Sequence, residues 1–236
     1  NVRKNVPLVH NITNYVTVND VANVLLACGG SPIMSDDSED VYDITSICGG
    51  LNINIGTLNK NTIPSMFIAG NRAKELGHPV LLDPVGAGAS KLRTDTAVKI
   101  VDEIHPDIIR GNISEIKTLA LGSGSTKAVV AVTGAIDLVT DGQKCYVIRN
   151  GRPEMSKITG TGCQLSGIMT AYAVANKDNM LEACAASVCL MGLAGETGYN
   201  NLMEGEGNST YRNRIIDAVY NIDGDTLEAG AKYEIR

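Results

Sequence analysis

Short unbroken runs of apolar residues alternate along this chain with longer segments in which apolar residues recur at helical spacing. The short runs, each ending near a glycine or a polar residue, are residues 31–34, 80–83, 107–110 and 129–133, and residues 51–56 alternate between apolar and polar positions like a strand. Runs of this length, rich in Val, Ile and Leu, are typical of buried parallel strands. The helical segments between them are residues 11–28, 62–77 and 94–105. This alternation predicts an α/β fold with helices on both faces of a mostly parallel central sheet.

The second half of the chain follows a different pattern. Residues 136–148 are expected to form an antiparallel hairpin, because Asp141-Gly142 is a favoured pair for a tight hairpin turn. Residues 161–199 and 211–220 are expected to be helical. No linker, low-complexity block or internal repeat interrupts the chain, so we expect a single domain that spans residues 1–236.

Charge and cysteine usage narrow the range of partners. The net charge of −6, from 20 Lys and Arg against 26 Asp and Glu, and the lack of any basic run argue against a nucleic-acid partner. No apolar stretch reaches the about 18–20 residues of a membrane span, and the polar N-terminal residues do not resemble a signal peptide. Six scattered cysteines without a Cys-x-x-Cys pair fit a reducing cytoplasm better than a disulfide scaffold.

The stretch Lys157-Ile-Thr-Gly-Thr-Gly-Cys163 joins a Thr/Gly loop to the start of a helix of small residues. Gly160 and Gly162 allow backbone N–H groups to converge on one point, and a helix N-terminus adds unpaired donors and about +0.5 of a charge. Such a site stabilises a phosphate. The Cys163 thiol would lie beside it, with a pKa below the free value of about 8.5. A Gly-Thr-Gly turn before a helix is also compatible with plain turn chemistry.

Three polar residues, Asp83, Arg110 and Thr133, lie at the ends of predicted strands, where open α/β sheets bind their ligands. Phosphoryl transfer requires charge stabilisation around the transferred group and Mg²⁺. Arg110 can bind a phosphate through two N–H groups, and Asp83 and Glu115 provide the oxygen ligands that Mg²⁺ prefers. Ordinary structural roles also fit: Asp83 before Pro84 favours a turn, and Glu115 suits the first turn of a helix.

Seven segments in one order carry a resemblance that covers almost the whole chain. They are residues 7–14 (PLVHNITN), 29–34 (GGSPIM), 54–58 (NIGTL), 82–88 (LDPVGAG), 110–115 (RGNISE), 132–137 (VTGAID) and 159–163 (TGTGC). Together they resemble the hydroxyethylthiazole kinases of the ribokinase-like superfamily. The resemblance implies a three-layer ribokinase-like fold. It also implies transfer of the ATP γ-phosphate to the hydroxyethyl group of 4-methyl-5-(2-hydroxyethyl)thiazole, a salvage step of thiamine synthesis.

The resemblance also implies roles for individual residues. The thiazole would lie against Met34, Gly160 and Asn14, the ATP against Arg110 and Thr133, the Mg²⁺ beside Asp83 and Glu115, and the reacting groups beside Gly160, Gly162 and Cys163. Family members are trimers with active sites between subunits, which implies a homotrimer in which Met34 serves a shared site.

Two features depart from the family pattern. Many ribokinase-like enzymes have Asp where this chain has Cys163, which puts a strong general base in doubt; such bases typically contribute ~10²–10⁴-fold. The family also has a further helical segment between the positions of Glu115 and Val129, so we expect a mobile segment near the nucleotide site to be missing from that stretch. Two alternatives stay open: a kinase for another small alcohol such as hydroxymethylpyrimidine, and a non-catalytic ligand-binding relative.

Overall fold

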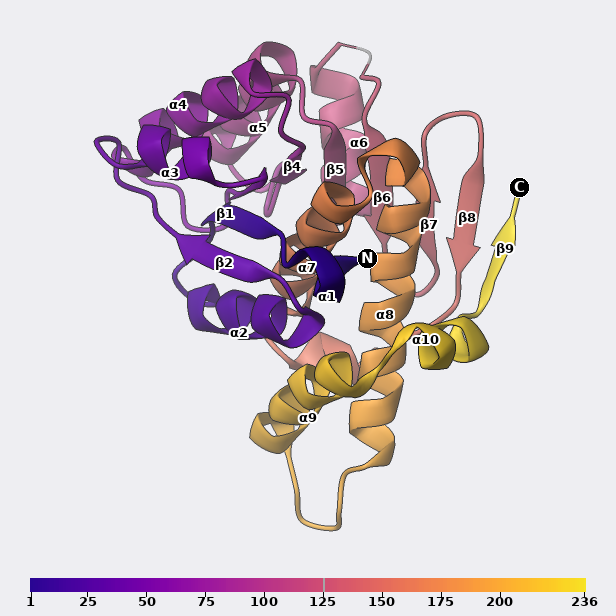
Figure 1. The fold of residues 1–236 in the computed structure, drawn as a ribbon. Helices are drawn as coiled ribbons and strands as arrows, with labels where there is room; N and C mark the ends of the chain where they lie inside the picture. Colours follow the sequence, from indigo (N-terminus) through magenta and orange to yellow (C-terminus); the bar gives the residue numbers. More distant parts are fainter. Residues whose placement is uncertain (125) are drawn as a thin grey trace.

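A single sheet runs through the computed structural model, which describes residues 1–124 and 126–236 (Figure 1). In that part of the chain the strand order is β2-β1-β3-β4-β5-β6-β7-β8-β9. The strands are β1 (Leu8–Ile12), β2 (Ser31–Met34), β3 (Gly50–Asn54), β4 (Val80–Asp83), β5 (Ile108–Asn112), β6 (Val129–Thr133), β7 (Asp137–Thr140), β8 (Cys145–Ile148) and β9 (Tyr233–Ile235). Strands β1 to β6 pair in parallel, and β7, β8 and β9 are antiparallel. The predicted mostly parallel sheet and the predicted hairpin are confirmed.

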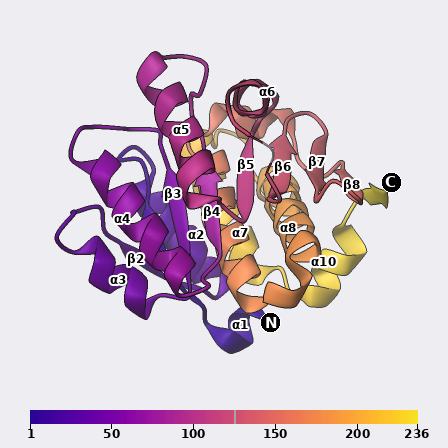
Figure 2. The same ribbon diagram turned by 90° about the horizontal axis from the view of Figure 1, so that it is seen from above.

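Helices cover both faces of the sheet. They are α1 (Val2–Asn5), α2 (Val18–Cys28), α3 (Val41–Ile47), α4 (Thr62–Glu75), α5 (Lys91–Ile104), α6 (Ile113–Gly122), α7 (Thr161–Ala175), α8 (Met180–Asn200), α9 (Asn208–Asn221) and α10 (Gly224–Gly230), with the 3₁₀ turns η1 (Pro153–Lys157) and η2 (Lys177–Asn179). Helices α4 and α5 lie on one side of the strands, and α7 and α8 lie on the other (Figure 2). Each side has its own apolar core. The predicted three-layer arrangement is confirmed.

The predicted helix over residues 11–28 is wrong in its first part. Residues Leu8–Ile12 form β1, which lies between β2 and β3, and the helix α2 begins only at Val18. Two polar residues, His10 and Asn11, interrupt the apolar pattern of β1 although both are buried. They are hydrogen-bonded inside the fold, His10 to Thr45 and Ser35, and Asn11 to Asn52. These distant partners satisfy the polar groups.

The strand β3 has the alternating pattern of a half-exposed strand, yet every one of its residues is buried. Leu51 and Ile53 pack into the core beneath α4 and α5. Asn52 and Asn54, on alternate positions and therefore on the opposite face, are 0% and 2% exposed. The polar face of β3 is thus covered by protein, because α7 contacts this strand.

Helix α8 is longer and more apolar than the sequence analysis recognised. Residues 177–200 meet the length and hydropathy criteria of a membrane span, which corrects the statement that no such stretch exists. Within the most apolar window of this segment, 72% of the residues are buried in the protein. Its buried side chains belong to the core that it shares with α2, α7 and α9. The helix is therefore apolar because it is a core helix.

Candidate active site

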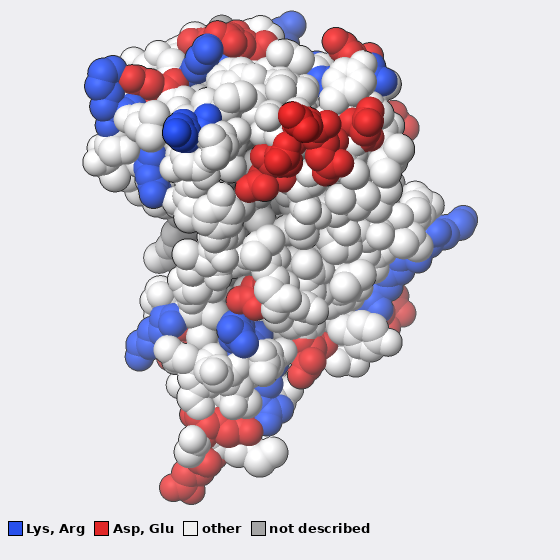
Figure 3. Space-filling model, turned by 90° about the vertical axis from the view of Figure 1, so that its left-hand side faces the viewer, with Lys and Arg blue, Asp and Glu red and all other residues white. Residues whose placement is uncertain are grey.

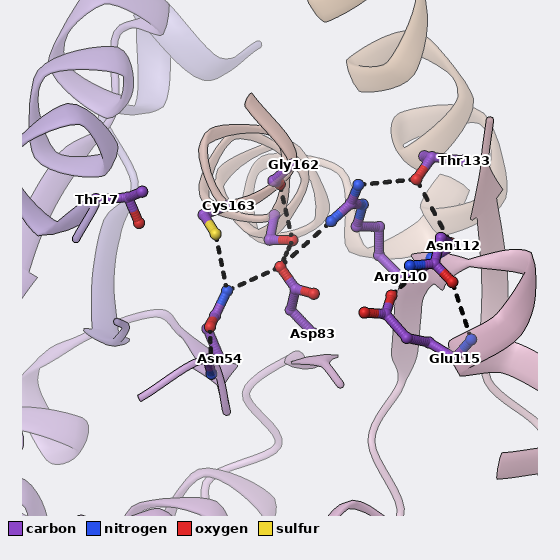
Figure 4. A network of polar contacts seen from close by, with 12 residues as sticks. Thr17, Asn54, Asp83, Arg110, Asn112, Glu115, Thr133, Gly162 and Cys163 are labelled. Carbon is purple, nitrogen blue, oxygen red and sulfur yellow. Dashed lines mark hydrogen bonds and ion pairs between the residues drawn. The ribbon is translucent and has the colours of Figure 1, made fainter. Parts of the chain in front are cut away.

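Polar groups lie at the carboxyl ends of four neighbouring parallel strands. Asn54 ends β3, Asp83 ends β4, Asn112 ends β5 and Thr133 ends β6, while the apolar Met34 ends the outer strand β2. Carboxyl ends of parallel strands lie at the same edge of a sheet, and that edge is where ligands bind in open α/β folds. The first turn of α7 lies against this row (Figure 4).

The predicted glycine loop forms the start of α7. Gly160 is the residue before the helix and has φ 84°, a left-handed conformation that glycine adopts at no steric cost. The first hydrogen bond of the helix joins the Gln164 N–H to the Gly160 carbonyl, so the N–H groups of residues 161–163 precede the helical ladder. Gly162 lies against Arg110: a Cβ at Gly162 would come within 2.5 Å of Arg110 Nη1. The loop and the guanidinium thus lie together, as an anion site requires.

Arg110 lies inside β5, two residues before the strand ends at Asn112 and not at the strand end as expected, and its side chain is held between the ends of β4 and β6. Its Nη2 donates to Thr133 Oγ1 at 2.8 Å, and its Nη1 lies 3.4 Å from Asp83 Oδ2. The same guanidinium lines a cavity of about 550 Å³ together with Thr133, Gly162 and Arg152. This volume lies within the ~300–1,000 Å³ of small-molecule pockets.

Asp83 is fully buried at the end of β4. Its Oδ2 accepts hydrogen bonds from Asn54 Nδ2 at 2.9 Å and from Ser166 Oγ at 2.8 Å. Burial raises the pKa of this carboxyl, and the charge of Arg110 opposes that shift only in part. The second oxygen, Oδ1, has no hydrogen-bond partner among the described residues. A buried carboxylate oxygen without a partner is suited to a cation or to water.

Glu115 closes the N-terminus of α6 in a capping box. Asn112 Oδ1 accepts from the Glu115 N–H at 3.0 Å, while Glu115 Oε2 accepts from the Asn112 N–H at 2.8 Å. The other oxygen, Oε1, accepts from the Gly86 N–H at 2.8 Å. Glu115 therefore joins α6 to the loop after β4, and its role as a first-turn helix residue is observed.

The Cys163 thiol lies in the first turn of α7, as predicted, but its predicted low pKa is wrong. Burial and the negative charge of Asp83 raise the pKa of this thiol, and hydrogen bonds to the sulfur oppose the shift only in part. The positive field at a helix N-terminus lowers the pKa of a nearby group only modestly. Burial and the neighbouring carboxylate outweigh this effect here, since Cys163 is 8% exposed.

Asn54 is a site residue that the sequence analysis missed. It connects Asp83 to Cys163, since its Nδ2 lies 2.9 Å from Asp83 Oδ2 and 3.2 Å from Cys163 Sγ. Asn14, which was expected at the thiazole, also donates to this sulfur, at 3.0 Å. The available signal was a carboxamide near the end of the predicted strand 51–56, in a sheet whose other predicted strands end in the polar residues Asp83, Arg110 and Thr133.

Met34 and Gly160 occupy different surroundings. Met34 lies at the end of β2, the outermost strand on that side of the sheet, and is partly buried against the core. Gly160 lies against Thr17, where a Cβ would come within 2.3 Å of Thr17 Cγ2. The thiazole contacts expected for both residues stay predictions.

Curated relatives match the chain from end to end. A protein of Clostridium acetobutylicum described as hydroxyethylthiazole kinase is 57% identical over 264 residues, which cover 99% of this chain and 97% of that protein. A protein of Ruminiclostridium cellulolyticum with the same description is 45% identical over 248 residues, which cover 94% and 90%.

The connection between α6 and β6 is the stretch in which a further segment was expected. The family pattern matches in two stretches, residues 1–129 and 121–225, which overlap in this connection. Residue 125 lies outside the described residues. The mobile segment expected between Glu115 and Val129 stays a prediction, and an intact mass of 24.9 kDa would contradict it.

Solved structures show the same fold. The structure of a hydroxyethylthiazole kinase protein from Pyrococcus horikoshii OT3 superposes with a TM-score of 0.92, at 34% identity, over 100% of this chain and 96% of that one. A pyridoxal kinase from Staphylococcus aureus superposes with a TM-score of 0.66 at 13% identity, over 98% and 99%, which shows a shared fold alone. The pattern described as "Hydroxyethylthiazole kinase family" covers residues 1–129 and 121–225. The chain therefore belongs to the hydroxyethylthiazole kinase family.

Proposed function

We propose that this protein transfers the γ-phosphate of ATP to the hydroxyethyl group of 4-methyl-5-(2-hydroxyethyl)thiazole, the salvage step of thiamine synthesis. In this reaction the alcohol oxygen bonds to the γ-phosphorus, the bond from that phosphorus to the ADP oxygen breaks, and the proton of the alcohol is released to the solvent. The observation that most supports this proposal is the position of the Arg110 guanidinium against Gly162. It places a cation beside the N–H groups at the N-terminus of α7.

The nucleotide phosphates fit the side of the site formed by β5 and β6. Arg110 and Thr133 line the cavity of about 550 Å³ and are hydrogen-bonded to each other at 2.8 Å, so the guanidinium is already oriented. The backbone donors at Gly160 and Gly162 would then face the transferred group. Positioning and charge stabilisation of this kind account for most of the catalysis of phosphoryl transfer.

The residues expected to hold Mg²⁺ fit that ion. Asp83 offers a buried oxygen that has no partner among the residues the structure describes, and Glu115 offers the further lone pairs of a carboxylate whose position the Gly86 and Asn112 amides fix. Among the described residues there is no group of three or more His, Cys, Asp and Glu side chains that would form a metal cage. Mg²⁺ usually takes one or two carboxylates and completes its shell with phosphates and water. When bound, it would neutralise charge on the transferred phosphate.

The acceptor alcohol would lie on the side of Asn14 and Cys163. The sulfur of Cys163 accepts two amide N–H bonds, and the raised pKa of the thiol keeps it protonated at neutral pH. A neutral thiol is a weak proton acceptor, so we expect Cys163 to orient the substrate hydroxyl more than to deprotonate it. Met34 and Gly160 would contact the ring, with Met34 serving a site shared between the subunits of a homotrimer.

The test is turnover of purified protein with ATP and Mg²⁺, measured in parallel on the thiazole alcohol and on hydroxymethylpyrimidine. We expect the thiazole phosphate and ADP in equal amounts, with a higher kcat/KM for the thiazole alcohol. Faster turnover of the pyrimidine alcohol would reassign the substrate. Binding of both ligands without a phosphorylated product would instead identify a non-catalytic relative.

A further inference from the structure

Asn54 uses every hydrogen-bonding position of its carboxamide at the centre of the site (Figure 4). Its Oδ1 accepts from the Gly56 N–H at 2.9 Å and from Asn14 Nδ2 at 3.3 Å. Its Nδ2 donates to Asp83 Oδ2 at 2.9 Å and to Cys163 Sγ at 3.2 Å. A backbone N–H can only donate, so the bond from Gly56 determines which end of the carboxamide is the oxygen.

We propose that Asn54 is a positioning residue for phosphoryl transfer, which holds the Cys163 sulfur and the Asp83 carboxylate at a fixed separation. Asp83 also lies beside Arg110 on the nucleotide side, whereas the sulfur lies beside Asn14 on the acceptor side. Asn54 thus joins the two halves of the site through one rigid group. This inference rests on the proposed kinase activity.

The chemistry of the carboxamide explains why asparagine is needed at position 54. The side chain is 2% exposed, so water cannot replace a missing donor there without rearrangement. Aspartate has the same shape but lacks both N–H groups, and it would add a second carboxylate beside the buried Asp83. Leucine has a similar volume and removes one donor from each acceptor, which leaves Asp83 Oδ2 with Ser166 and Arg110 and the sulfur with Asn14 alone. Glutamine keeps the two donors on a chain that is longer by one CH₂.

The pH at which the Cys163 thiol loses its proton is a direct measure of this positioning role of Asn54. Two N–H donors to the sulfur favour the thiolate, whereas burial and Asp83 favour the thiol. Asp83 on β4 is the titratable group that faces the sulfur, and Arg110 on β5 lies on the far side of Asp83. Loss of the Asn54 donor therefore moves the titration of Cys163 to higher pH. A residue that only supports β3 would leave this titration unchanged.

Asn52 offers a matched control on the same strand. It is also a buried carboxamide, 0% exposed, two residues earlier and on the same face of β3. Its Nδ2 donates to Asn11 Oδ1 at 3.0 Å, away from the thiol and the carboxylate of the site. Replacement of Asn52 by aspartate thus makes the same chemical change in the same strand without touching the network around Asp83.

The experiment compares wild type with the Asn54→Asp, Asn54→Gln and Asn52→Asp variants. Alkylation of Cys163 by iodoacetamide is followed against pH by mass spectrometry of its peptide, and kcat and KM are measured for the thiazole alcohol and ATP. For Asn54→Asp we expect the alkylation midpoint to move to higher pH. We also expect kcat to fall by about 10–100-fold while both KM values change by less than about threefold, because misplacement of reacting groups mainly affects kcat.

The Asn54→Gln variant should lose less kcat than Asn54→Asp, because it keeps both donors, and it serves as the test if Asn54→Asp does not fold. Asn52→Asp should keep the wild-type midpoint and kcat. An unchanged midpoint in Asn54→Asp, or an equal shift in Asn52→Asp, would overturn the proposal. The alkylation measurement needs no substrate, so it tests the contact of Asn54 with Cys163 even if the wild type does not phosphorylate the thiazole alcohol. Absence of turnover in the wild type would reject only the kinase activity.

Discussion

Asp83 and Cys163 show how burial controls the chemistry of single residues in this site. Each is enclosed at the same edge of the sheet, and burial raises the pKa of both groups. Asp83 also acts on Cys163, since its negative charge raises the pKa of the thiol further. Groups with perturbed pKa values are concentrated at active sites.

The first prediction concerns Cys163. Because the thiol is mostly protonated at neutral pH, its contribution as a base is small. We expect Cys163→Ala to lower kcat by less than about 100-fold, the lower limit for a typical general base. Cys163→Asp should keep or increase kcat, since a carboxylate accepts a proton more readily than a neutral thiol. Steady-state kinetics at pH 7 checks both, and a loss of about 10⁴-fold in Cys163→Ala would show that the thiol is the base.

The second prediction concerns the stability of the fold against pH. The folded-state pKa of Asp83 is raised above its ordinary value of 3.8, so the folded protein binds this proton more tightly than the unfolded chain does. That contribution to the free energy of unfolding is present below pH 3.8 and is lost as the pH rises through the folded-state pKa.

Asp83→Asn removes this titration. We therefore expect the free energy of unfolding of wild type, relative to Asp83→Asn, to decrease as the pH rises from 4 toward 7. Urea denaturation at a series of pH values measures the difference. A difference between the two proteins that stays constant with pH would show that folding does not raise the pKa of this carboxyl.

At the scale of elements, the site exists because helix α7 begins against the strand ends. Its first turn carries Gly160 and Gly162, and each glycine allows a side chain from elsewhere to approach the backbone. Arg110 approaches at Gly162 and Thr17 at Gly160. On the other side, the capping box of α6 holds Glu115 against the Gly86 loop. Helix ends thus position both the anion site and the carboxylates.

The third prediction tests the contact between α7 and Arg110. A Cβ at position 162 would lie 2.5 Å from Arg110 Nη1, so Gly162→Ala must displace the guanidinium. We expect kcat/KM for ATP to fall by about 100-fold, as a displacement of about 1 Å near reacting groups does. Gly224→Ala is the control, because no atom lies within 4 Å of a Cβ there. Equal kinetics for the two variants would contradict a role of Arg110 in ATP binding.

At the scale of the whole molecule, the β2 edge of the sheet is the surface where a shared site would form. Exposed apolar side chains occur in the elements of this side, with Val16 68%, Leu26 58% and Ile47 65% exposed. Figure 3 looks onto this side and shows acidic side chains gathered beside a broad uncharged surface. Exposed apolar patches are typical of contacts between proteins, which is consistent with an interface on this side.

The fourth prediction concerns assembly. Light scattering on purified protein should give three times the intact mass of one chain if the homotrimer forms. Leu26→Glu should lower this mass toward that of one chain, because a carboxylate buried in an apolar interface is costly. Lys99→Glu, on the α5 side of the sheet, should leave the mass unchanged. A wild-type mass equal to that of one chain would rule out the trimer.

Several parts of this protein follow from the sequence alone. Short apolar runs between helical segments predicted the parallel sheet with helices on both faces, because local periodicity reflects which faces are buried. Asp141-Gly142 predicted the hairpin, because its turn is determined by two adjacent residues. Asp83, Arg110 and Thr133 were predicted to meet for a topological reason: the carboxyl ends of parallel strands share one edge.

Only the tertiary structure decided which polar residues are buried together. The sequence could not assign His10 and Asn11 to a strand, since their partners at Thr45, Ser35 and Asn52 are distant in the chain. Nor could it give the raised pKa of Cys163, because that value depends on burial and on the distance to Asp83. Asn54 is a further case: local pattern predicts its strand, whereas its role depends on the two groups between which the fold places it.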